Sequence, residues 1–167
     1  GMDTNLDKQN DNVVVVEVFQ VNCPGCFMYG IPESIEIYNK YRSEGVSVLG
    51  MATAFEDFDK NTIENLQLLL ETGEAVGETK KMLQGGKISY KIPYPVAMDS
   101  LIKQSGDVTK EKMDSLIKNQ IPNFDTQPEN YKNQIYERVK DYFMSKEFSA
   151  ETFEMYSLQG TPSSILV

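Results

Sequence analysis

Short apolar runs alternate with helical patterns in the first part of the chain. Residues 13–19 (VVVVEVF) form a nearly continuous apolar run, which is typical of a strand buried on both faces in a parallel sheet. Apolar positions then recur at helical spacing through residues 31–41. A second buried strand is predicted over residues 46–54, and a capping pattern at residues 61–64 (NTIE) begins another helix. This order predicts a βαβα unit with parallel strands.

The periodicity weakens after this unit. Residues 74–86 have the pattern of a further helix, and residues 92–99 form an extended segment stiffened by prolines. Residues 160–167 (GTPSSILV) have the pattern of a turn followed by the beginning of a strand. Since the chain has 167 residues, we expect a single domain that spans residues 1–167.

Residues 107–150 are polar with helical periodicity. A break is predicted at residues 121–123 (IPN), and a capping box with an internal proline at residues 126–129 (TQPE) begins the second helix. The segment has too few large apolar residues for a core of its own, because chains of about 40 residues or fewer rarely fold alone. We therefore expect residues 107–150 to be a helical insertion within the single domain.

The composition excludes several classes of chemistry. Sixteen basic and twenty-five acidic residues give a formal charge of −9, which argues against nucleic acid and anionic membrane surfaces as partners. Histidine is absent and there are only two cysteines, so neither a histidine-activated nucleophile nor a four-ligand Cys/His zinc site can form. We expect no metal and no cofactor.

The sequence also suggests where the protein acts. No stretch approaches 18 consecutive apolar residues, so no membrane-spanning helix is predicted. Gly1 is interpreted as the remnant of a cleaved tag before Met2, the native initiator methionine, and residues 3–12 lack the basic-then-apolar plan of a signal peptide. We expect a cytoplasmic protein, or an exported one if a signal sequence was removed upstream.

Cys23-Pro24-Gly25-Cys26 follows directly after the first predicted strand. This context places Cys23 at the N-cap of a helix, where unpaired amides and the helix dipole favour a thiolate, and Pro24 suits the first helical position. Cys26 lies about one turn further on, so Cys23 is suited to attack a disulfide and Cys26 to resolve the mixed intermediate. The alternatives are a structural staple, which would constrain little in so short a loop, and half a metal site, for which further ligands are lacking.

Six strings along the chain match one known family: residues 13–19, the CPGC motif, GIP at 30–32, MATAFEDF at 51–58, YPVAMD at 94–99 and GTP at 160–162. Taken together, these strings resemble the thioredoxin superfamily, and within it the redoxin branch of the TlpA-like disulfide reductases and the alkyl hydroperoxide reductase/thiol-specific antioxidant relatives. The resemblance implies an α/β, thioredoxin-like fold with a βαβα unit and a cis-proline strand. Because the insertion has helical periodicity but no core of its own, we expect it to lie before that strand and to pack over or beside the redox site.

The resemblance also implies roles for individual residues. Pro162 would be the cis-proline opposite the disulfide, and Thr161 would offer backbone hydrogen bonds to a docked substrate; with Pro24 and Gly25 these residues would form the substrate-binding surface. Glu17 stands six residues before the first cysteine. In thioredoxins an acid at this offset is buried beneath the second cysteine and passes protons to it. The alternative is a strand glutamate that points to water, although its apolar neighbours favour burial, which would raise its pKa.

The sequence departs from the family pattern in two places. Asn22 precedes the first cysteine, where the superfamily usually has an aromatic residue; this departure bears on substrate docking and not on the disulfide chemistry. In addition, thioredoxin folds continue past the cis-proline strand, whereas this sequence ends at Val167. Either the sequence is truncated or the helices of residues 107–150 replace the missing elements.

The main functional hypothesis is a thiol–disulfide oxidoreductase that reduces protein disulfides in cell redox homeostasis. Its partners would be a disulfide-containing protein or small molecule and a thiol electron donor. A peroxiredoxin-like peroxidase is an alternative, but Gln20 stands where such enzymes have threonine, and Arg42 and Arg138 are the only arginines. A non-catalytic thioredoxin-like binding module, with the insertion as its partner surface, is the third hypothesis.

Overall fold

A computed structural model describes residues 9, 12–103, 109–145 and 148–167 of the chain. The chain divides into two compact units, Gly1–Ile102 with Ala150–Val167, and Lys103–Ser149. In the part of the chain that the structure describes, no helix is both long enough and apolar enough to cross a membrane.

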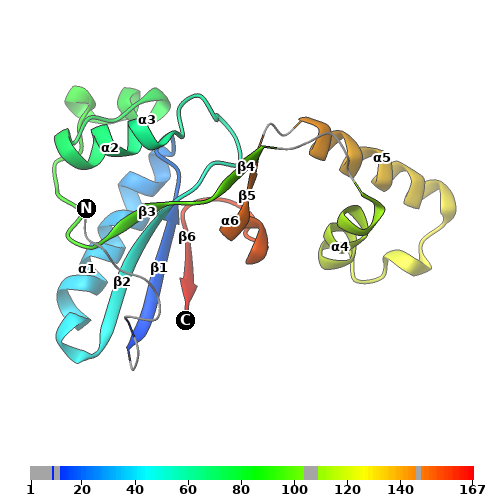
Figure 1. The fold of residues 1–167 in the computed structure, drawn as a ribbon, viewed down its shortest axis with the longest axis horizontal. Helices are drawn as coiled ribbons and strands as arrows, with labels where there is room; N and C mark the ends of the chain where they lie inside the picture. Colours follow the sequence, from blue (N-terminus) through cyan, green and yellow to red (C-terminus); the bar gives the residue numbers. More distant parts are fainter. Residues whose placement is uncertain (1–8, 10–11, 104–108, 146–147) are drawn as a thin grey trace. The chain divides into compact units, whose positions relative to one another are not determined.

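The first unit is built on a four-stranded sheet with the order β3-β2-β1-β6 (Figure 1). β1 (Val13–Phe19) and β2 (Val46–Ala52) are the two apolar runs, and they pair in parallel as predicted. β3 (Val96–Met98) adds a third parallel strand beside β2, and β6 (Ser163–Leu166) is antiparallel to β1. This sheet confirms the predicted α/β class.

Three helices follow the order that the sequence predicts. α1 (Ile31–Tyr41) continues into the short 3₁₀ turn η3 (Arg42–Glu44), and Gly45 ends it with a φ of 82°, a left-handed value that glycine adopts without strain. α2 (Ile63–Thr72) and α3 (Gly77–Met82) come next, and the 3₁₀ turn η4 (Gln84–Gly86) follows α3.

The cap of α2 differs from the prediction by one residue. The Thr62 side chain accepts the hydrogen bond from the Asn65 N–H, so Thr62 rather than Asn61 is the N-cap. Asn61 is buried, and its side-chain oxygen accepts from the Asn22 N–H at 2.8 Å instead. The residue expected to cap a helix therefore anchors the segment that precedes the cysteines.

The core lies on both faces of the sheet, because successive strand residues point to opposite sides. Val14, Val16 and Val18 of β1 pack on one face with Phe153 of α6 (Glu151–Met155). The other face carries a second cluster of buried residues, drawn from the ends of β1 and β2 and from the helices that follow them. Its members are Phe19, Val21, Cys26, Phe27, Ile31, Ala52, Leu66, Leu69 and Ala75.

Asp99 fixes the beginning of α6. Its carboxylate is buried and accepts hydrogen bonds from the Thr53 hydroxyl at 2.8 Å and from the Thr152 and Phe153 N–H groups at 2.9 and 3.2 Å. An acid at a helix N-terminus satisfies donors that have no partner within the helix. Asp99 thereby joins the segment after β3 to the helix that leads toward β6.

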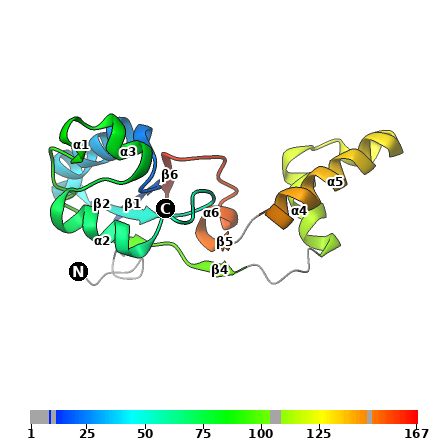
Figure 2. The same cartoon turned by 90° about the horizontal axis from the view of Figure 1, so that it is seen from above.

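The second unit contains the helices α4 and α5 (Figure 2). α4 (Lys110–Gln120) ends where the break was predicted; the 3₁₀ turn η5 (Phe124–Thr126) and α5 (Glu129–Ser145) follow. The predicted cap of α5 is wrong: the Thr126 hydroxyl donates to the Asn123 carbonyl within the turn, and α5 begins only after the proline. Among the described residues of the second unit, the buried apolar side chains are Ile117 of α4, Phe124 of η5 and Phe143 of α5.

Two short strands, β4 (Leu101–Lys103) and β5 (Phe148–Ala150), form a two-stranded sheet. The boundaries between the two units fall inside these strands. The packing of the predicted insertion, residues 107–150, against the redox site stays a prediction.

Candidate active site

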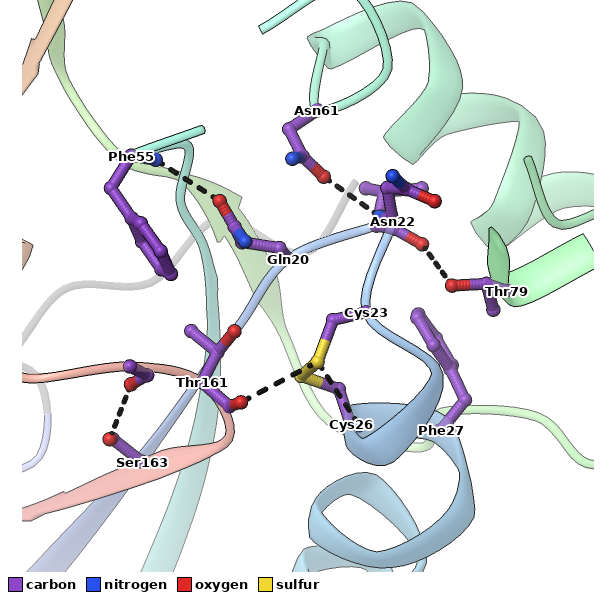
Figure 3. Close-up of a disulfide and its surroundings, with 12 residues drawn as sticks. Gln20, Asn22, Cys23, Cys26, Phe27, Phe55, Asn61, Thr79, Thr161 and Ser163 are labelled. Carbon is purple, nitrogen blue, oxygen red and sulfur yellow. Dashed lines mark hydrogen bonds between the residues drawn. A yellow bond between two sulfur atoms is a disulfide. The ribbon is translucent and has the colours of Figure 1, made fainter. Parts of the chain in front are cut away.

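Cys23 and Cys26 lie just beyond the end of β1 and are joined by a disulfide, with their Cα atoms 5.4 Å apart (Figure 3). Helical backbone begins at Pro24, so Cys23 occupies the N-cap position that the sequence predicts. The Cys26 N–H donates to the Cys23 carbonyl at 3.1 Å and lies 3.3 Å from the Cys23 Sγ. Cys26 is fully buried, whereas Cys23, Pro24 and Gly25 are partly exposed. Solvent therefore reaches the first cysteine and not the second.

The helix is π-helical where it leaves the cysteine motif. Residues Cys26–Gly30 form this turn (η2), in which the Ile31 N–H donates to the Cys26 carbonyl. The Tyr90 hydroxyl donates to the Phe27 carbonyl at 2.7 Å, so a side chain from outside the helix satisfies one acceptor of the turn. Turns of this kind inside helices are often found at functional sites. Neither the π-helical turn nor Tyr90 had a signal in the sequence.

Thr161 and Pro162 lie against the cysteine motif, although they are far from it in sequence. The peptide bond between them is cis, and the Cys23 Sγ lies 3.6 Å from the Thr161 carbonyl oxygen. A sulfur in a disulfide carries no proton, so this is a contact here, and it becomes a weak hydrogen bond when the thiol is present. A Cβ added to Gly25 would lie 3.9 Å from the Pro162 Cδ. The structure thus brings the four predicted substrate-binding residues to one place.

Glu17 lies inside the fold and is only 2% exposed. One carboxyl oxygen, Oε2, accepts a hydrogen bond from the Ser164 hydroxyl at 2.9 Å, and the other, Oε1, has no partner among the residues that the structure describes. Burial raises the pKa of Glu17 to about 7, the Ser164 hydrogen bond lowers it, and the nearby negative charge of Glu33 raises it further. Glu17 is therefore not a strand residue that points to water.

Gly30 lies close to both Glu17 and Pro162. A Cβ on Gly30 would lie 2.6 Å from the Pro162 Cβ and would overlap the Glu17 Oε1. Real Cβ atoms do not approach neighbours so closely, so only glycine lets the helix come this near to both groups. The sequence offered a weak signal, a glycine within a helical pattern, but no reason for it.

Asn22, the residue before Cys23, is held by three hydrogen bonds. Its backbone N–H donates to the Asn61 Oδ1, its side-chain Nδ2 donates to the Asp57 carboxylate at 2.7 Å, and its Oδ1 accepts from the Glu78 N–H at 2.7 Å. Asn22 is only 8% exposed. The departure from the family's aromatic residue thus has a structural role, since it ties the loop after β2 and the start of α3 to the residue next to Cys23.

Replacing Asn22 by alanine is expected to lower the free energy of unfolding by about 2 kcal/mol, because it removes two side-chain hydrogen bonds and leaves the Glu78 N–H without its acceptor. Urea unfolding measures this loss. Asn130→Ala is the matched control: its side chain is exposed and accepts from the adjacent Tyr131 N–H, so a change within about 0.5 kcal/mol is expected. If Asn22→Ala changes stability no more than this control does, the hydrogen bonds of Asn22 contribute nothing to the fold.

Comparison with known proteins identifies the fold. No protein-family model matches the sequence, and no curated protein does. A crystal structure of a thioredoxin-like superfamily protein matches with a TM-score of 0.57 and 24% identity, over 99% of this chain and 69% of that one. A thiol-disulfide isomerase from Corynebacterium glutamicum has the same TM-score and identity, over 100% of this chain and 70% of its own. The chain therefore has a thioredoxin-like fold, as the residue strings predicted.

Proposed function

We propose that this protein is a thiol–disulfide oxidoreductase that reduces disulfides in proteins or small molecules and is itself reduced by a thiol donor. The observation that carries the proposal is the Cys23–Cys26 disulfide at the start of a helix, in contact with the Thr161–Pro162 segment. The thiol-disulfide isomerase among the structural neighbours supports the same chemistry.

The reaction is a transfer of two electrons in two exchange steps. In the reduced protein, the Cys23 thiolate attacks one sulfur of the substrate disulfide; a bond between Cys23 and the substrate forms, and the first substrate thiolate leaves. Cys26 then loses its proton and attacks the Cys23 Sγ, which breaks the mixed disulfide and releases the second substrate thiolate. The protein is left with the Cys23–Cys26 disulfide, and two thiol groups of the donor reduce it again.

The environments of the two cysteines support this division of roles. Cys23 is partly exposed and lies at the start of the helix, where the positive end of the dipole favours its thiolate. Cys26 is 0% exposed, and burial in an apolar environment opposes the formation of its thiolate, so its attack requires a base. Glu17 has the pKa near 7 that a base needs at neutral pH, and the sequence contains no histidine.

The peroxidase alternative gains no support from Gln20. This side chain is buried, and its amide oxygen accepts a hydrogen bond from the Phe55 N–H at 3.0 Å. It provides no hydroxyl for a peroxide at the position where peroxiredoxins have threonine. We therefore retain disulfide reduction as the proposed reaction.

The test is insulin reduction with dithiothreitol as the donor, measured alongside hydrogen peroxide turnover. The wild-type protein is expected to accelerate insulin precipitation, and Cys23→Ser is expected to reduce the rate to that of dithiothreitol alone. Wild-type activity at the background level for insulin and for small-molecule disulfides would refute the proposal. Peroxide turnover that depends on Cys23, without disulfide reduction, would establish the peroxidase in its place.

A further inference from the structure

We propose that Ser164 is a positioning residue, whose hydroxyl holds one oxygen of Glu17 so that the other is directed toward the helix that carries Cys26. This inference rests on the proposed function, in which Glu17 accepts the proton of Cys26. Ser164 itself does not contact the reacting sulfur in this scheme. It acts through the carboxyl group of Glu17.

The geometry arises from the pairing of β1 with β6. Glu17 and Ser164 are partners in the antiparallel register of these strands, so their side chains lie on the same face of the sheet. The Ser164 hydroxyl donates to the Glu17 Oε2 at 2.9 Å. The hydroxyl is a single donor and is fully used by this bond.

The other carboxyl oxygen is free and is directed toward the redox helix. Glu17 Oε1 has no hydrogen-bond partner in the described part of the chain, although it is buried. A Cβ on Gly30, in the turn that begins at Cys26, would overlap this oxygen. A buried carboxyl oxygen without a partner is costly for stability. Because the fold nevertheless keeps Oε1 without a partner on the side of the redox helix, we infer that Glu17 exchanges protons there.

The electrostatic surroundings explain why such a donor is needed. Glu33 on α1 places a second negative charge near Glu17, and Tyr94, before β3, interacts with Glu17 and hydrogen-bonds to Ser34. Burial and Glu33 both favour the protonated carboxyl, whereas the hydrogen bond from Ser164 favours the ionised form that accepts a proton. Loss of the hydroxyl is therefore expected to raise the pKa of Glu17 and to free the carboxyl to rotate.

The experiment measures the resolution step in the full chain as a function of pH. Reduced protein is mixed rapidly with an aromatic nitrobenzoate disulfide, whose thiolate absorbs visible light. The first phase of release reports the attack by Cys23 and the second phase the resolution by Cys26. The variants are Ser164→Ala and the matched pair Ser164→Thr and Ser164→Val, which have similar shapes and differ in the hydroxyl.

Ser164→Ala and Ser164→Val are expected to shift the pH midpoint of the second phase upward by about one unit, which makes it about fivefold slower at pH 7. Ser164→Thr is expected to keep the wild-type midpoint. So is Ser163→Ala, because the Ser163 hydroxyl donates to the Gly160 carbonyl and not to Glu17. Wild-type midpoints in both the alanine and valine variants, or equal shifts in the threonine and valine variants, would overturn the proposal.

The Glu17→Gln variant separates this inference from the proposed function. If Glu17→Gln resolves the mixed disulfide with the wild-type rate and pH profile, Glu17 is not the base, and both claims about it fail. If Glu17→Gln is slow while Ser164→Ala keeps the wild-type midpoint, only the role of Ser164 fails. If both proposals hold, removing Ser164 in the Glu17→Gln background has no further effect on the second phase.

Discussion

Replacing Cys26 by serine is expected to stop the reaction after its first step and leave the substrate bound to Cys23 through a mixed disulfide. Cys23 remains partly exposed at the start of the helix, so its attack continues, but no buried sulfur is present to complete the exchange. Steady-state turnover should fall by roughly a thousandfold or more, because residues that act as one catalytic unit fail together. Intact-protein mass spectrometry detects the trapped adduct.

Selective alkylation of the reduced wild-type protein is the control for these roles. A limiting amount of iodoacetamide is expected to modify Cys23 first, since Cys26 is 0% exposed. Cys23→Ser should form no stable mixed disulfide under the conditions that trap Cys26→Ser. Faster labelling of Cys26, or an adduct in Cys23→Ser alone, would reverse the assignment of the two cysteines.

Replacing Glu17 by glutamine is expected to slow resolution of the mixed disulfide by about 10²-fold at pH 7, the lower end of what a general base contributes. The wild-type rate should rise with pH around a midpoint near 7, because burial raises the pKa of Glu17 to about that value. Glu17→Gln should lack this midpoint while retaining the wild-type rate of the first phase. Stopped-flow release of the aromatic thiolate measures both phases.

The stability of the same variant shows whether the carboxyl is buried, independently of catalysis. The pKa of Glu17 is about 7 in the folded protein against an ordinary value of 4.5, so the folded state binds the proton more tightly. The stability that proton binding to Glu17 gives the fold is therefore complete below pH 4.5 and is lost as the pH rises through 7. At pH 8, Glu17→Gln should therefore be more stable than the wild type by about 1–3 kcal/mol. Increased stability with unchanged kinetics would mean that Glu17 is buried but that water accepts the proton.

Much of the first unit could be predicted from the sequence because its signals are local. A run of four valines followed by Glu-Val-Phe predicts a buried strand wherever it occurs, and the residues Val13–Phe19 form that strand. The N-cap position of Cys23 likewise depends only on the residues beside it. Even the capping of α2 was predicted to within one residue, and the error arose because Asn61 has a partner 39 positions away.

The arrangement of the site was decided by contacts between distant segments. Ser164 is 147 residues from Glu17, and neither its own position nor its neighbours indicate that it donates to a buried carboxylate. The same holds for Gly30, whose requirement for glycine comes from Pro162 and Glu17 on other strands and turns.

The sequence by itself determined the strands β1 and β2, the helices α1 and α2, the cysteine motif and the presence of an acid in an apolar strand, because periodicity and composition act over a few residues at a time. Only the tertiary structure decided which oxygen of Glu17 is held by a donor and which is left without one. It also decided that Asn22 bonds to both the loop after β2 and the start of α3. Those features depend on strand register and on the close approach of backbones, and pairing β1 with β6 brings together residues that no local pattern connects.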